Sequence, residues 1–126
     1  MRAEAELRQA ITVAPRDAES YAHYGMFLSW LGRFEEAEVV LKQGDQIDPR
    51  SHVLHLGWCL RFYLNRDYTN FLQAATRLLT LDSNSVVGLS WQAKAYERLR
   101  QYGKALEIAQ KLKQLDPAPD FVAFSA

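Results

Sequence analysis

The feature that most constrains the fold of this chain is a spacing of 34 residues at which similar side chains return. An aromatic row at this spacing consists of Phe34, Tyr68 and Tyr102. An aliphatic row, followed each time by an aspartate, consists of Ile47, Leu81 and Leu115. A period of this length indicates stacked copies of one small structural unit, none of which can bury its apolar face alone.

The same offset divides the 126 residues into repeats of a single expected domain, 1–126. Its segments are a half repeat at 2–14, whole repeats at 18–51, 52–85 and 86–119, and the start of a terminal helix at 120–126. Apolar residues recur at helical spacing in every segment, and no segment alternates as a strand does. Each whole repeat is interrupted near its middle, at 31–33, 65–67 and 100–101, so it should form two helices.

Small residues stand near the middle of each expected first helix, in a row that consists of Gly25, Cys59 and Ala93. Such residues let the second helix of a pair approach closely, while larger side chains fill the space above and below them. Neighbouring pairs must then stack to cover the apolar faces that remain. The sequence therefore predicts an all-α solenoid of antiparallel helix pairs.

The copies resemble the tetratricopeptide repeat, whose signature runs W-x-x-L-G-x-x-Y, then Ala-x-x-x-Phe, then Pro. The matching residues of the first repeat are Tyr21, Tyr24, Gly25, Leu28, Ala37, Leu41 and Pro49; those of the third are Leu89, Ala93, Tyr96, Ala105 and Pro117. The second repeat departs most, with Phe71 at the family's Ala position and Ala75 at its Phe position. The resemblance covers residues 2–117 and implies a right-handed superhelix whose first helices line a concave face.

By that resemblance, the concave face would form a groove that binds a protein or peptide partner. Its lining would consist of Ala22, His23, Met26, Trp30, Leu56, Leu60, Tyr63, Leu64, Val87, Trp91, Lys94 and Arg98. Aromatic anchors of this kind suit an extended or helical peptide, and Lys94 with Arg98 could hold a carboxylate. The alternative is that some of these side chains pack between adjacent repeats.

Charge and composition argue against several other classes of protein. The net charge is zero and the isoelectric point is about 6.8, whereas nucleic-acid-binding domains are usually basic. No apolar run approaches the ~18 residues of a membrane span, and residues 1–14 do not form a secretory signal. A lone cysteine, Cys59, fits a reducing compartment, so we expect a cytoplasmic protein with no nucleic-acid or membrane partner.

The sequence contains no pattern that indicates catalysis or a cofactor. Neither a Gly-rich phosphate loop nor a Gly-x-Ser-x-Gly turn occurs. His52, His55 and Cys59 fall on one helical stripe, but three ligands on one helix seldom complete a tetrahedral zinc site. We therefore expect no enzyme activity, no metal and no cofactor.

Two functional hypotheses remain. The leading one is a non-catalytic interaction module that binds a peptide or helix of another protein. The alternative is a structural or regulatory segment of a larger bacterial-type signalling or transcription-related protein, acting through self-association or packing between domains. A solenoid normally needs polar residues at its ends, or its open ends must be covered by self-association. The candidates for a homodimer contact of this kind are Phe121 and Phe124.

Overall fold

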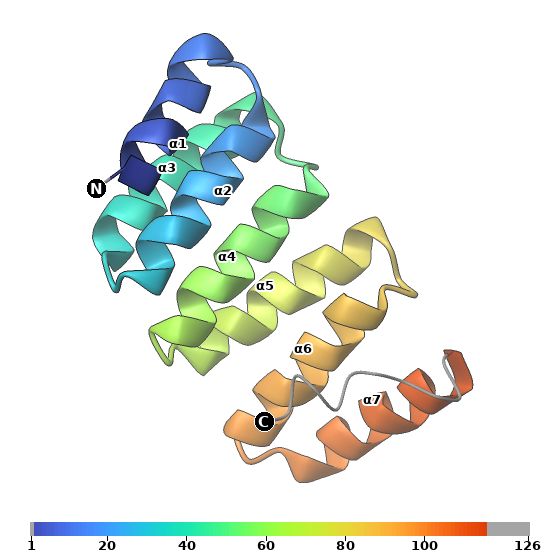
Figure 1. Ribbon diagram of the computed structural model, residues 1–126. Coiled ribbons are helices and arrows are strands. Elements are labelled where there is room, and N and C mark those ends of the chain that lie inside the picture. The colour runs from blue at the N-terminus through green and yellow to red at the C-terminus, as the bar shows by residue number, and fades with distance from the viewer. Residues whose placement is uncertain (1, 116–126) are drawn as a thin grey trace. The chain divides into compact units, whose positions relative to one another are not determined.

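The computed structural model describes residues 2–115, which form seven helices and no strand (Figure 1). The helices are α1 (Arg2–Val13), α2 (Ala18–Trp30), α3 (Phe34–Ile47), α4 (His52–Leu64), α5 (Tyr68–Leu81), α6 (Val86–Arg98) and α7 (Tyr102–Leu115). The predicted all-α fold is thereby confirmed. The chain divides into two compact units, 1–67 and 68–126, with the boundary inside the second expected repeat.

In unit 1 (residues 1–67), α2 packs against α1, α3 and α4 (Figure 1). The absence of a side chain at Gly25 permits the contact with α3, because a β-carbon there would lie 2.6 Å from Leu41 Cγ. Gly44 has the same role between α3 and α4, since its β-carbon would lie 2.6 Å from Leu54 Cδ1. Leu28, Leu41 and Leu54 fill the centre of this unit and are buried.

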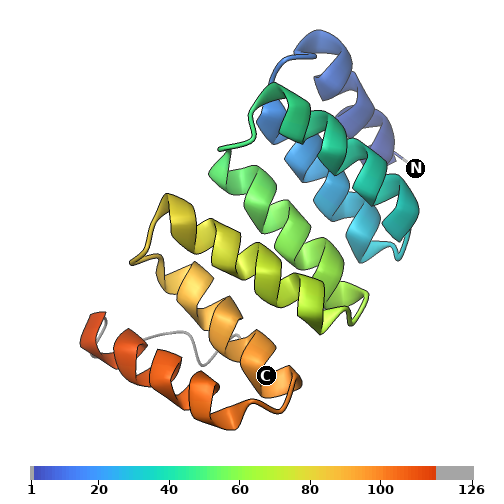
Figure 2. The same ribbon diagram turned by 180° about the vertical axis from the view of Figure 1, so that it is seen from behind.

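In unit 2 (residues 68–126), α6 lies between α5 and α7 (Figure 2). Phe71 of α5 is buried, with its ring centroid 6.2 Å from that of Trp91 on α6. Leu78, Leu89 and Leu112 contribute one fully buried side chain from each of the three helices. The expected terminal helix at 120–126 lies outside the described residues.

Polar side chains fix where the first helices begin. The carboxylate of Asp17 accepts from the backbone N–H of Glu19, and Ser51 Oγ accepts from that of Leu54. Ser85 Oγ accepts from Gly88 N at 3.0 Å at the start of α6. These caps satisfy donors that a helix leaves free in its first turn, so α2, α4 and α6 begin in equivalent ways.

The turns that follow the first helices also share one backbone conformation. Gly32, Arg66 and Arg100, which are 34 residues apart, have φ values of 77°, 59° and 63°. Each donates its N–H to a carbonyl three residues earlier at 3.0 Å. An L-residue in this left-handed region costs about 1–2 kcal/mol, which Gly32 avoids and the two arginines do not.

Candidate partner-binding face

Eight of the predicted groove residues lie on α2 and α4 of unit 1, which pack against each other, and all of them except the fully buried Ala22 form one set. We call this set the first-helix face: His23, Met26, Trp30, Leu56, Leu60, Tyr63 and Leu64. The two helices approach through Gly57, where a β-carbon would lie 3.6 Å from the carbonyl oxygen of Ala22 and 3.8 Å from Met26 Cε. Ala22 itself is fully buried, so it belongs to the contact between the helices rather than to the exposed face.

Exposure is uneven across the first-helix face. Trp30 at the end of α2 is 67% exposed, and His23 is exposed as well. Met26 and the four residues of α4 are partly buried. An exposed tryptophan is typical of binding surfaces, because it offers a large apolar area at little entropic cost.

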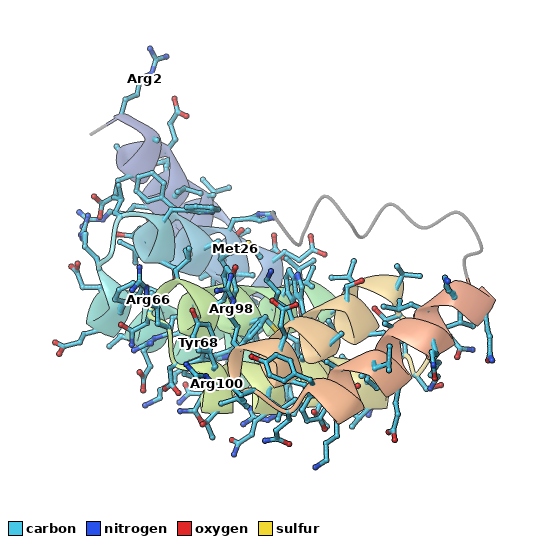
Figure 3. The ribbon with its side chains drawn as sticks, turned by 90° about the horizontal axis from the view of Figure 1, so that it is seen from below. Arg2, Met26, Arg66, Tyr68, Arg98 and Arg100 are labelled. Atoms are coloured by element: carbon cyan, nitrogen blue, oxygen red, sulfur yellow. The ribbon has the colours of Figure 1, made fainter. Side chains whose placement is uncertain are left out.

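The remaining predicted residues lie on α6 of unit 2. Val87 is 43% exposed near the start of the helix, whereas Trp91 is partly buried against Phe71. Arg98 is exposed, and its guanidinium carbon lies 5.8 Å from the ring centroid of Tyr68 (Figure 3). This cation–π contact orients Arg98 along the α5 surface.

Lys94 differs from the sequence-based expectation of two accessible bases. It is only 5% exposed, and its Nζ lies 3.9 Å from a carboxylate oxygen of Glu97. A buried ammonium group is not presented to a ligand, so of the predicted pair only Arg98 is exposed.

A polar network that the sequence did not reveal joins α1 to the rest of unit 1. Glu4 Oε2 accepts from Tyr24 Oη at 2.7 Å and from Arg8 Nη2 at 3.0 Å. Arg33 donates to both carboxylate oxygens of Glu4, at 2.8 and 3.0 Å, and also to Glu36. The hydrogen bonds from Arg33, followed by that from Tyr24, lower the pKa of Glu4 to about 2. Every member has partners within the protein, so we interpret the network as structural.

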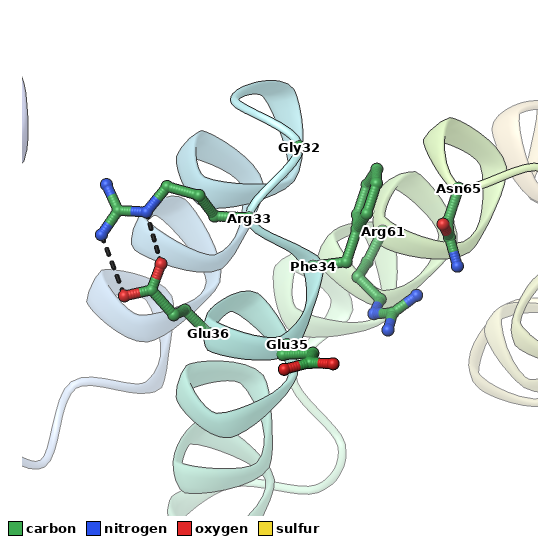
Figure 4. Close-up of a pocket in the computed structure, with 7 residues that line it drawn as sticks. All are labelled: Gly32, Arg33, Phe34, Glu35, Glu36, Arg61 and Asn65. Atoms are coloured by element: carbon green, nitrogen blue, oxygen red, sulfur yellow. Dashed lines mark hydrogen bonds and ion pairs between the residues drawn. The ribbon is translucent and has the colours of Figure 1, made fainter.

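A cavity of about 440 Å³ opens beside this network, between the α2–α3 turn, the start of α3 and the end of α4 (Figure 4). One of its lining residues is the buried Arg61, whose guanidinium carbon lies 5.5 Å from the ring centroid of Phe34 and 5.3 Å from that of Phe62. Arg61 Nη2 donates to Glu38 at 3.1 Å, whereas its Nε has no hydrogen-bond partner. The other charged side chains that line the cavity are Arg33, Glu35 and Glu36. Two arginines and two glutamates thus line the cavity.

The described residues contain no metal-binding cluster of three or more His, Cys, Asp or Glu. His55 Nε2 lies 2.9 Å from the carbonyl oxygen of Pro49, and Cys59 is fully buried. Across residues 2–115, none of the helices combines the length and the apolarity that crossing a membrane requires. The self-association candidates Phe121 and Phe124 lie outside the described residues, so that idea stays a prediction.

Comparison with known proteins agrees with the fold. The sequence profile described as tetratricopeptide repeat matches residues 18–51 and 89–119, which together make up just over half of the chain. The solved structure of MamA AMB-1 in space group P212121 has a TM-score of 0.76 at 16% identity, covering 94% of this chain and 70% of that chain. MamA MSR-1 in space group C2 has a TM-score of 0.74 at 17% identity, covering 92% and 67%. A search of curated proteins returned no match.

Proposed function

Because the chain belongs to the tetratricopeptide repeat family, we propose that it is a non-catalytic interaction module that binds a peptide or helix of a partner protein. The first-helix face of unit 1 is the surface to which we assign this binding. The observation that carries the assignment is Trp30, a large apolar side chain left 67% exposed at the end of α2, one turn after the partly buried Met26 on the same helix.

The chemistry of this face supports an apolar ligand. Its seven residues include no carboxylate, lysine or arginine, and His23 is its one titratable side chain apart from the phenol of Tyr63. Met26 and Trp30 are four residues apart on α2, as are Leu56 and Leu60 on α4, so each helix presents a stripe along its axis. A helix or extended peptide laid across these stripes would bury Trp30, and a buried tryptophan anchor typically contributes about 2 kcal/mol or more.

Selection of ligands from a library of displayed helical and extended peptides tests this proposal. Peptides selected on the whole chain should bind Trp30→Ala about 30-fold more weakly, as expected for the loss of an anchor. The matched control is Val39→Ala, because Val39 is 58% exposed on α3, a helix that contributes no residue to the first-helix face, and this change should alter the affinity less than about twofold. The proposal fails if the selected peptides tolerate alanine at Trp30, Met26 and Leu60 alike.

A further inference from the structure

The second helix of each repeat presents equivalent residues at 34-residue spacing along one side. We call these positions the second-helix flank. Its members are Phe34, Glu38 and Asp45 on α3; Tyr68, Leu72 and Leu79 on α5; and Tyr102, Leu106 and Lys113 on α7. Because they occupy the same register, they face the same direction on their own helices.

On α3, the second-helix flank is the surface on which α4 docks. Arg61 of α4 covers the ring of Phe34 at 5.5 Å and donates a hydrogen bond to Glu38 at 3.1 Å. One turn earlier on α4, Trp58 Nε1 donates to Asp45 Oδ2 at 2.9 Å. Both ends of the flank are thus occupied by one neighbouring helix.

On α5, the same flank carries α6, although its chemistry is different. Arg98 lies over Tyr68, and Gly88 stands so close to Leu79 that a β-carbon would lie 3.0 Å from Leu79 Cδ2. Leu72 in the middle of the flank is partly buried. The flank therefore docks a helix in both units, whether its central residue is an acid or an aliphatic side chain.

On α7, no helix among residues 68–115 occupies the flank, since α7 packs against α6 alone within this part of unit 2. Tyr102 is 62% exposed and Leu106 is 60% exposed, and Lys113 is exposed as well. Large apolar side chains at a position that docks a helix elsewhere in the same chain indicate a docking surface that these residues leave open.

We propose that the second-helix flank of α7 binds an acidic amphipathic helix of a partner protein, laid on α7 as α4 is laid on α3. This surface is separate from the first-helix face, and the proposal goes beyond the function assigned to that face. It commits to a partner helix, rather than to residues 116–126 of this chain or to a second copy.

Charge complementarity gives the partner its acidic character. Lys113 stands where α3 has Asp45, so the polarity of this contact is reversed and the docked helix should present a carboxylate here. Lys113 is the one lysine among the flank positions of α7, because Lys104 points to α6, where its Nζ lies 5.6 Å from the ring centroid of Tyr96, and Lys111 is two residues from Lys113 and so on another side of the helix. The exposed ammonium group of Lys113 attracts a carboxylate of the docked helix and raises the rate of encounter.

The register also predicts an apolar position in the partner. On α4, the residue that contacts Glu38 of the α3 flank is Arg61. The equivalent pair in the next repeat is Leu72 on α5 and the buried Ala95 on α6. An aliphatic residue at this flank position therefore pairs with an apolar residue of the docked helix, and we expect the same for Leu106. Because Trp58 and Arg61 are three residues apart, the partner helix should carry an acid followed three residues later by an apolar side chain.

A peptide made from the chain's own α6 provides a defined probe. A labelled peptide of residues 85–99 with Gln92→Glu places a carboxylate in the register of Trp58 and keeps Ala95 in the register of Arg61. Fluorescence anisotropy with the whole chain should detect binding, and Leu106→Asp should weaken it at least about tenfold. Val39→Asp, an equally exposed change on α3, and Trp30→Ala on the first-helix face should leave it unchanged.

A charge exchange separates specific docking from general stickiness. The native chain should prefer the Gln92→Glu peptide to a Gln92→Lys peptide, and Lys113→Glu in the protein should reverse that preference. Absence of binding, or binding that Leu106→Asp does not weaken, would overturn the proposal. Binding that begins only after residues 116–126 are deleted would assign the flank to the chain's own segment, and a flank blocked by concentration-dependent dimerisation would assign it to a second copy; either outcome also overturns the proposal.

Discussion

Helices α3 and α7 occupy equivalent places in two repeats, yet the second-helix flank is partly buried on α3 and exposed on α7. On α3 the flank is covered by Arg61 and Trp58, so Phe34 and Glu38 are partly buried. On α7 the corresponding Tyr102 and Leu106 are more than half exposed. The repeat register therefore sets which way a side chain faces, whereas the neighbouring helix determines whether that side chain is buried or exposed.

The largest expected effect contrasts the covered contact with the open one. Leu54→Ala removes a fully buried side chain that packs at Gly44, and it should lower the free energy of unfolding by about 3 kcal/mol. Leu106→Ala on the open flank should change it by less than about 0.5 kcal/mol. Urea denaturation of both variants measures the contrast, and equal losses would show that the α7 flank is as covered as that of α3.

A smaller loss is expected at Arg61, which joins α4 to the α3 flank. Arg61→Ala removes two ring contacts and the hydrogen bond to Glu38, and should lower the free energy of unfolding by about 2 kcal/mol. The cost stays moderate because Glu38 keeps its ion pair with Lys42 at 3.0 Å. Arg61→Met retains an apolar stem, so it should lower the free energy of unfolding by less than about half of the loss in Arg61→Ala. Equal losses in the two variants would show that the charge, rather than the packing of the stem, dominates.

The turns between paired helices allow a comparison without any change of packing. Arg100→Gly relieves a left-handed arginine and should raise the free energy of unfolding by about 0.5–1 kcal/mol. Gly32→Ala in unit 1 should lower it by a similar amount, because no atom lies within 4 Å of the added β-carbon and only the backbone is strained. Thermal denaturation of both variants checks the two signs, and a shift of the same sign in both would contradict this account.

The polar network of unit 1 should make the attachment of α1 depend on pH. The pKa of Glu4 is lowered from 4.5 to about 2, so its stabilising effect is complete above about pH 4.5 and is lost as the pH falls toward 2. Glu4→Gln should therefore lower the urea midpoint at about pH 6 and have a shrinking effect between about pH 4.5 and 2. A difference between wild type and Glu4→Gln that stays constant over this range would remove Glu4 as the cause.

Much of the fold could be predicted from the sequence, because the 34-residue register and its turn residues mark helix boundaries directly. The interruptions expected at 31–33, 65–67 and 100–101 coincide with the turns after α2, α4 and α6. The groove lining that contains Trp30 was expected from the resemblance to the repeat family and stays a prediction.

The 34-residue register could not predict which side chains are buried or which polar groups make contacts between distant parts of the sequence. Lys94 falls on the predicted face but is buried, because helical periodicity gives direction and not depth. Arg61 has no charged counterpart in the other repeats, where Phe27 and Ala95 stand in its row, so no pattern marked it. The partners of Glu4 on other elements lie 20 and 29 residues away, and only the folded chain brings them together.

The reactivity of a thiol at position 106 tests most directly whether the flank of α7 is open in solution. In Leu106→Cys, one thiol should react with Ellman's reagent about as fast as a small free thiol, while the fully buried Cys59 reacts slowly, as in the native chain. The rate should not depend on protein concentration. A thiol at position 106 as protected as Cys59 would show that the flank is already covered, and would contradict the account.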